Sequence, residues 1–126
     1  NLYSRRDWGH AKDYVVAIWK MLQQKKAKDY VIATGKQHSV KDFINLVAKE
    51  LKISISWKGR GLQEKGYLNN KKVISIDKKY FRPTEVNSLL GDAKKARKDL
   101  NWKPQFNIRA LVKDMVAEEL KILKND

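Results

Sequence analysis

The 126-residue sequence contains no cysteine and only two histidines, His10 and His38. The lack of cysteine excludes a disulfide framework, a Cys zinc site and a cysteine nucleophile. Two isolated histidines also exclude the Cys/His spacings of structural zinc sites. No apolar run approaches the length of a membrane span, and the first residues lack the apolar stretch of a signal peptide. We therefore expect a soluble, cytoplasmic protein.

The sequence also lacks a recognisable catalytic group. Catalysis requires a nucleophile or an acid–base pair in one place, and His10 and His38 are far apart, each at the start of an expected helix. Ser39 is better explained as a helix cap than as a nucleophile. A glycine-rich fingerprint of the kind that binds dinucleotides is absent. We therefore expect no catalytic residue in this chain.

Negative charge is scarce relative to positive charge. The sequence has 28 Lys and Arg against 14 Asp and Glu, which gives a formal net charge of +14. Such an excess attracts polyanions, so nucleic acid or a phosphate-bearing small molecule is a possible partner. The lysines are scattered through every segment, which is typical of a solvated surface. A basic nucleic-acid-binding module is the less favoured alternative, because the aromatic residues fall at core spacing rather than on an exposed stacking strip.

Apolar spacing predicts a first helix over residues 11–24. Its expected buried stripe consists of Ala11, Val15, Ile18, Trp19 and Leu22. Val16 and Met21 lie off this stripe, so a second face of the helix is partly apolar. A pure interaction domain that uses this two-sided helix as an interface is therefore a third hypothesis, beside packing inside the domain or against a missing one.

Three further helices follow. One begins at the cap Ser39, where Asp42 completes a capping box. The next runs over 92–100, and Asn101 is expected to end it in a left-handed conformation. Asn107 caps the last helix, whose apolar stripe is formed by Ile108, Leu111, Val112, Met115, Leu120 and Leu123.

Short apolar or alternating runs at 29–35, 53–57 and 73–76 predict strands, of which the first is expected to be buried. Residues 59–72 are polar and glycine-rich, and they are expected to form a loop long enough to have a function. The fold class is therefore α/β, with helices packed on a few short strands. A single domain is expected over 1–126.

Two clusters have the composition of a phosphate-binding site. Arg5-Arg6-Asp7-Trp8-Gly9 joins a strand end to a helix start, where backbone N–H groups and guanidinium groups favour anions. Phe81-Arg82-Pro83-Thr84-Glu85 combines a cation with a carboxylate that can accept hydrogen bonds from a diol. The alternatives are an Arg–Asp pair within the first loop and a buried ion pair within the second.

Taken together, the clusters resemble the extended short-chain dehydrogenase/reductase family and, within it, the GDP-mannose 4,6-dehydratases. The likeness covers essentially the whole chain. It is carried by residues 6–15, 31–35 and 38–40, by Glu64-Lys65-Gly66, by Tyr80-Phe81-Arg82-Pro83-Thr84-Glu85-Val86, by Leu90-Gly91-Asp92 and by Leu100-Asn101-Trp102-Lys103-Pro104.

The resemblance implies specific roles for a few residues. Arg6 and Arg82 would contact the diphosphate of GDP-mannose from opposite sides. Glu85 would hold the ribose hydroxyls, and Lys65 and Gly66 would lie in a loop near the nucleotide. The whole enzyme would use NADP to convert GDP-mannose to GDP-4-keto-6-deoxymannose, a step toward GDP-fucose and other deoxysugars.

The resemblance also implies that much of the enzyme is missing. In that family an N-terminal Rossmann domain binds NADP and carries a Tyr-x-x-x-Lys motif that has no counterpart here. Ile18 and Thr34 stand four positions after Tyr14 and Tyr30. We therefore expect a C-terminal substrate-binding portion that is inactive alone and binds no NADP itself. The whole enzyme is expected to be a homo-oligomer, dimer or tetramer.

Overall fold

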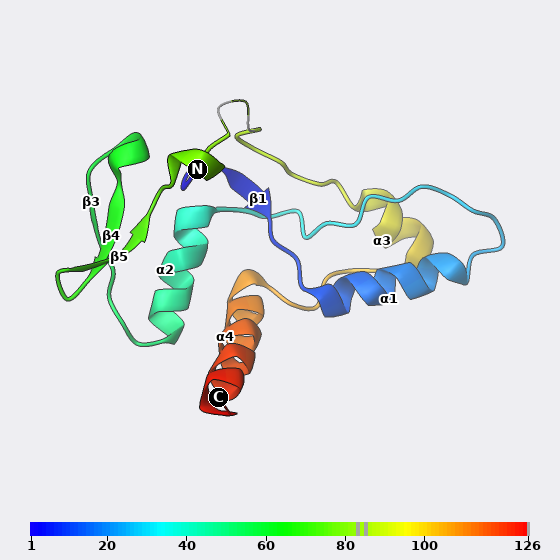
Figure 1. Cartoon of the computed structure of the whole chain (residues 1–126). Coiled ribbons are helices and arrows are strands. Elements are labelled where there is room, and N and C mark those ends of the chain that lie inside the picture. The colour runs from blue at the N-terminus through cyan, green and yellow to red at the C-terminus, as the bar shows by residue number, and fades with distance from the viewer. Residues whose placement is uncertain (83, 85, 126) are drawn as a thin grey trace.

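The computed structural model describes residues 1–82, 84 and 86–125, so Pro83 and Glu85 of the second cluster lie outside the described residues. The chain mixes helices with short strands (Figure 1), which confirms the α/β class. In chain order the elements are β1 (Arg5–Asp7), α1 (Ala11–Leu22), β2 (Gln37–Ser39), α2 (Val40–Glu50), β3 (Ser56–Lys58), β4 (Lys65–Leu68), β5 (Lys71–Ser75), α3 (Lys94–Leu100) and α4 (Ile108–Asn125), with 3-10 turns at Gly61–Gln63 and Lys78–Tyr80.

The strands form two small antiparallel sheets. β1 pairs with β2, and β3, β4 and β5 form a meander. The segment 87–89 runs along the free edge of β1, where the N–H of Arg5 donates to the carbonyl of Asn87 at 2.8 Å. The N–H of Leu89 donates back to the carbonyl of Arg5 at 3.1 Å. Residues more than 80 positions apart in the sequence therefore lie side by side at β1.

The prediction of a loop over 59–72 is wrong for its second half. Residues 65–75 form the hairpin of β4 and β5, which turns at Asn69 and Asn70. Both asparagines have positive φ, 48° and 63°, as a type I′ hairpin turn requires. The prediction followed the polar, glycine-containing composition of residues 59–72, whereas the pair Asn69-Asn70 indicates a hairpin turn.

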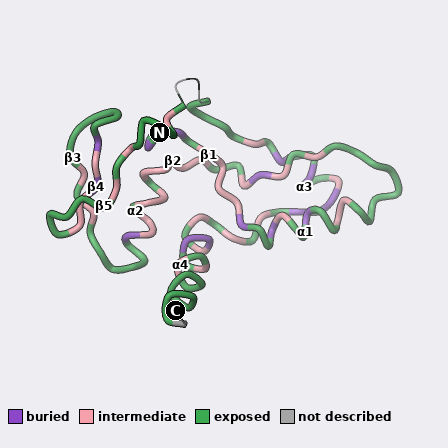
Figure 2. Tube along the Cα trace, viewed as in Figure 1, coloured by how far each residue is buried: buried purple, intermediate pink, exposed green. Residues whose placement is uncertain are grey.

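The main core lies between α1 and α3 (Figure 2), where buried residues gather. Ala17 of α1 packs with Ala93, Ala96 and Leu100 near α3 and with Trp102 beyond it. The small alanines let the two backbones approach closely. As predicted, α3 ends at Asn101, which has a φ of 47° in the left-handed region.

The predicted buried stripe of α1 is wrong. Val15, Trp19 and Leu22 are 59%, 60% and 76% exposed, whereas the opposite side of the helix, with Asp13 and Ala17, is buried. The helix has apolar residues on both sides, and spacing alone does not decide which side faces the core. The exposed side is therefore an apolar surface that no described residue covers.

The predicted buried strand at 29–35 is also wrong. Its chain is extended, but the backbone N–H and C=O groups of residues 30–33 form no hydrogen bonds with the described residues. Val31 is 54% exposed, although Ala33 is buried against the α1–α3 core. The sequence has the composition of a strand, but a strand also needs a partner, and the described residues supply none.

The second packing unit joins α2 to α4. Ser39 and Asp42 form the predicted capping box of α2, and the Oδ1 of Asn107 accepts the N–H of Ala110 at 3.0 Å, as expected for the cap of α4. Leu111 and Val112 are buried, so the first half of the α4 stripe packs as predicted. The second half, with Met115, Leu120 and Leu123, is exposed. In the described part of the chain, no helix combines the length and the apolar character that crossing a membrane requires.

Asp13 joins α1 to the chain that leads into α4. Its carboxylate is buried and accepts the N–H groups of Gln105 and Phe106, each at 3.0 Å. The indole Nε1–H of Trp102 donates to the Asp13 carbonyl at 3.0 Å. One residue therefore anchors the whole 102–106 segment.

Asp13→Ala should reduce the free energy of unfolding by about 2–4 kcal/mol, because two backbone donors lose their acceptor in a buried place. Chemical denaturation followed by circular dichroism measures the change. Asp29→Ala, at an exposed carboxylate with no described partner, is the control and should change stability by less than about 0.5 kcal/mol. Equal effects of the two substitutions would contradict the anchoring role.

Candidate functional site

Arg6 lies on β1 and reaches toward the segment that follows the second cluster. Its Nη1 donates to the carbonyl of Val86 at 2.7 Å and to that of Arg5 at 2.9 Å. The carboxylate of Asp7 turns to another segment, where it accepts the N–H of Thr34 at 2.9 Å, the Thr34 hydroxyl at 2.6 Å and the N–H of Gly35 at 2.8 Å. These contacts differ from the Arg–Asp pair considered from the sequence.

The Trp8-Gly9-His10 turn fixes the end of β1. The Nε1–H of Trp8 donates to the carbonyl of His38 at 2.9 Å, and its ring stacks on Phe43 of α2 with centroids 4.4 Å apart. His10 is the N-cap of α1, and its Nδ1 accepts the N–H of Lys12 at 3.1 Å. Because Nδ1 accepts, Nε2 carries the proton in the neutral ring and donates to Asp114 at 3.0 Å. His10 therefore caps α1, at whose expected start the sequence placed it.

Tyr14 packs directly beside this turn, where its ring fills the space next to Gly9 that a Cβ would occupy. Burial raises the pKa of the Tyr14 phenol, and the nearby carboxylates of Asp7 and Asp13 raise it further. The phenol therefore stays protonated at neutral pH and serves as packing for the turn.

Arg82 is exposed and has no hydrogen-bond or ion-pair partner among the described residues. Three residues separate it from Val86, so its Cα lies within about 14 Å of that of Val86. Arg6 donates to the Val86 carbonyl, so the first cluster contacts the residue that directly follows the second cluster. Glu85, predicted to hold the ribose, lies outside the described residues.

Lys65 and Gly66 lie in β4, the central strand of the meander, and not in the loop that was expected. Gly66 is buried, and a Cβ there would approach Ile55 and Ile74. This packing accounts for the glycine, because a larger side chain would push against both isoleucines. Lys65 is half-buried at the start of the strand.

Sequence reasoning missed a charged cluster that fixes the start of β4. Glu64 is buried. Its carboxylate accepts a hydrogen bond from the Tyr3 hydroxyl at 2.7 Å and forms an ion pair with Lys41 of α2. The Lys41 ammonium lies 4.8 Å from the Trp57 ring centroid and 5.4 Å from that of Tyr3. The members are far apart in the sequence, so no local pattern marks them.

The fold is shared with a class of nucleotide-sugar enzymes. The chain resembles UDP-glucose 4-epimerase from Thermotoga maritima with a TM-score of 0.73 at 19% identity, over 98% of this chain and 34% of that one. It also resembles RMD from Pseudomonas aeruginosa, solved with NADPH, with a TM-score of 0.70 at 15% identity, over 94% of this chain and 33% of that one. The architecture of this chain is therefore similar to that of about a third of each of these proteins.

Sequence similarity narrows this class to one family. The model of the GDP-mannose 4,6 dehydratase family matches residues 1–115, and the chain belongs to that family. It is 49% identical to the GDP-mannose 4,6 dehydratase of Dictyostelium discoideum over 99% of this chain and 36% of that protein. It is 47% identical to the Drosophila melanogaster protein over 100% of this chain and 32% of that protein. It is 44% identical to the Vibrio cholerae protein over 97% of this chain and 36% of that protein.

The chain thus spans about a third of the length of the relatives it matches. The resemblance noted from the sequence is confirmed, and these comparisons give no support to the alternative of a nucleic-acid-binding module.

The Lys41–Glu64 pair makes stability depend on pH. The Lys41 ammonium and the Tyr3 hydroxyl lower the pKa of Glu64 below its ordinary value of 4.5, whereas Glu64 raises that of Lys41 above 10.5. The contribution from Glu64 is therefore complete above pH 4.5 and is lost as pH falls through the lowered pKa. The contribution from Lys41 is complete below pH 10.5 and is lost as pH rises through the raised pKa.

Glu64→Gln should lower the melting temperature at pH 7 and flatten the loss of stability below pH 4.5. Melting temperatures measured from pH 3 to pH 8 test this expectation. Glu118→Gln makes the same chemical change on the exposed face of α4, where the pair with Lys121 is largely exposed, and should leave the profile nearly unchanged. Parallel profiles for Glu64→Gln and the parent chain would refute the role of the cluster.

Proposed function

We propose that this chain is the substrate-binding portion of a GDP-mannose 4,6-dehydratase and that it grips the diphosphate of GDP-mannose with Arg6 and Arg82. The supporting observation is that Arg6 contacts the carbonyl of Val86, 80 positions away and directly after the second cluster. Guanidinium groups make forked hydrogen bonds to phosphate oxygens, so two of them suit a diphosphate. Glu85 would accept hydrogen bonds from the ribose hydroxyls.

Arg6 and Arg82 would bind the diphosphate in different ways. Arg6 is half-buried and already oriented by two carbonyls, so it would lose little rotamer freedom when a phosphate arrives. Arg82 is exposed and has no described partner, so it would order only when the nucleotide sugar binds. Lys65 would add a weaker electrostatic attraction from β4.

NADP belongs to the whole enzyme in this proposal, and the residues present do not fit it. Within the described residues, no strand leads through a glycine-rich turn into a helix, and the space beside Gly9 is filled by Tyr14. The related RMD structure was solved with NADPH, which supports the cofactor for the complete protein. This chain would contribute binding of the substrate and no catalytic residue.

We further propose that the rest of the enzyme covers the exposed side of α1 and pairs with the open backbone of residues 30–33. Ile18 and Trp19 are 53% and 60% exposed on this side, a surface typical of an interface. The remaining two-thirds of the relatives' length is sufficient to supply it. Assembly of the whole enzyme into dimers or tetramers, and a cytoplasmic location, remain predictions.

Arg82→Gln should weaken GDP-mannose binding by about 10- to 100-fold, because a charge-assisted contact to phosphate is lost. The measurement is isothermal titration calorimetry on this chain and on an enzyme extended by the missing part. Arg6→Gln should weaken binding at least as much, although it also removes the contact to Val86. Arg82 has no such contact, so its loss reports on the ligand alone.

Arg60→Gln is the matched control, since Arg60 is exposed and forms no described hydrogen bond through its side chain. It should bind GDP-mannose like the parent. If the extended enzyme bound no NADP and formed no 4-keto product from GDP-mannose, the proposed function would be wrong.

Ile18→Glu should affect the stability of the isolated chain and of the complete enzyme differently. In the isolated chain it should cost less than about 0.5 kcal/mol, because the side chain faces solvent. In the extended enzyme it should cost about 2–3 kcal/mol, because the carboxylate would enter an apolar interface. Thermal unfolding of both proteins tests this difference, and an equal cost in the two would show that the side of α1 stays open.

A further inference from the structure

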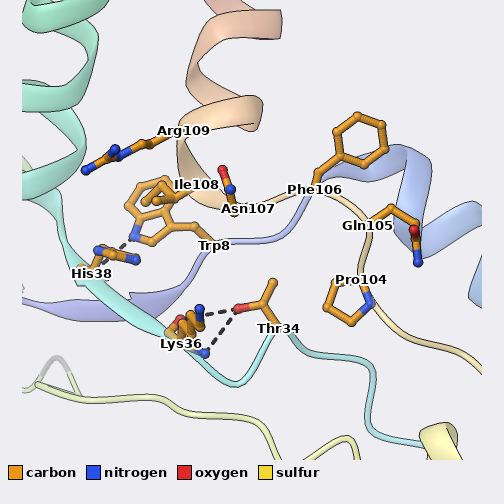
Figure 3. A pocket seen from close by; sticks show the side chains of 10 residues that line it. All are labelled: Trp8, Thr34, Lys36, His38, Pro104, Gln105, Phe106, Asn107, Ile108 and Arg109. Atoms are coloured by element: carbon orange, nitrogen blue, oxygen red, sulfur yellow. Dashed lines mark hydrogen bonds between the residues drawn. The ribbon is translucent and has the colours of Figure 1, made fainter.

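A cavity lies apart from the arginines assigned to the diphosphate. It has a volume of about 420 Å³ and lies between the Trp8 turn, the 34–38 segment and the start of α4 (Figure 3). This volume is in the range of small-molecule pockets. Neither Arg6 nor Arg82 lines it, and neither does Lys65. The proposed function therefore leaves this cavity unassigned.

The walls of the cavity are fixed by contacts within the chain. Trp8 is held between its hydrogen bond to the carbonyl of His38 and its stacking on Phe43. The ring of Phe106 stacks on His10 with centroids 4.2 Å apart, and its N–H is held by Asp13. These rings lose little freedom when a ligand binds, so the apolar part of the site is preorganised.

The charged side chains of the cavity have the same sign. Lys36 comes from the 34–38 segment and Arg109 from the start of α4, and both line the same space (Figure 3). None of the described residues that line it is a carboxylate, and neither Lys36 nor Arg109 forms an ion pair with a described residue. Asp42, beside His38 and Arg109 in the adjacent hollow, accepts the N–H of Ser39 in the capping box.

The helix α4 adds to this positive potential. It is 18 residues long and begins at the cavity, where Ile108 and Arg109 form its first turn. The Asn107 side chain accepts a hydrogen bond from the N–H of Ala110. The N–H groups of Ile108 and Arg109 have no acceptor among the described residues. The positive end of the helix dipole therefore supports the two side-chain cations.

We propose that this cavity is a second ligand site, which binds a small phosphorylated molecule with a sugar-like or other compact ring. The phosphate would lie between Lys36 and Arg109 at the start of α4. The ring would lie against Trp8, whose apolar surface complements a ring better than water does. The site is separate from the diphosphate grip, so its occupant would act as an effector of the enzyme or as an additional substrate contact.

Two-dimensional NMR of the ¹⁵N-labelled chain, titrated with glucose 6-phosphate, tests this proposal. The indole N–H signal of Trp8 and the backbone signals of Lys36 and Arg109 should shift and saturate. Glucose at the same concentrations, and sodium chloride at the same ionic strength, should not reproduce the shifts. The double variant K36Q/R109Q should weaken binding by about tenfold or more, because two charge-assisted contacts are removed.

Two further variants keep the test specific. Lys36→Arg with Arg109→Lys preserves both charges and should retain binding within a few-fold. Lys58→Gln with Arg60→Gln removes one Lys and one Arg from exposed positions at and after β3 and should bind like the parent. Equal binding by K36Q/R109Q and the parent would overturn the proposal, as would shifts that glucose or sodium chloride reproduces.

Discussion

The arrangement of this chain depends on two aspartates that accept backbone N–H groups from distant segments. Asp7 holds residues 34 and 35, and Asp13 holds residues 105 and 106. The two carboxylates lie on either side of the Trp8-Gly9-His10 turn, so one short stretch organises segments from the middle and the end of the chain. The N–H groups that the two aspartates bind belong to the backbone and are present whatever the side chain. Each of them needs an acceptor at that place, so both aspartates are needed at their own positions.

This constraint also places the residues that the sequence marked for function. Asp7 faces residues 34 and 35, whereas Arg6 reaches the carbonyl of Val86 on the other edge of β1. Adjacent side chains on one strand thus reach segments on opposite edges of β1. Part of the net charge of +14 would act locally in two places, the proposed diphosphate site and the cavity at the start of α4.

Local sequence signals predicted the parts of the fold that depend on local chemistry. The caps at Ser39 and Asn107 and the left-handed Asn101 were all predictable, because each is decided within a few residues. The buried side of α1 was not predictable, since it depends on which of two apolar faces finds a partner. The Lys41–Glu64 pair was missed for the same reason, because its members meet only after folding.

The candidate site was predictable from its motifs but not from its geometry. The sequence singled out Arg6 and Arg82, and the structure places Arg6 in contact with Val86, which directly follows the second cluster. It placed Lys65 in a loop because glycine and polar residues surround it, whereas the Asn69-Asn70 turn makes the region a hairpin. The cavity lined by Lys36 and Arg109 had no sequence signature, since its members come from segments about 70 positions apart.

The backbone of residues 30–33, which forms no hydrogen bond with any described residue, has a consequence for the behaviour of the free chain in solution. An extended apolar segment with open N–H and C=O groups is a template for pairing with another chain. Two copies can satisfy each other's open groups by pairing edge to edge. The solubility of the free chain would then fall with concentration, and anything that occupies this edge would act as a solubilising partner.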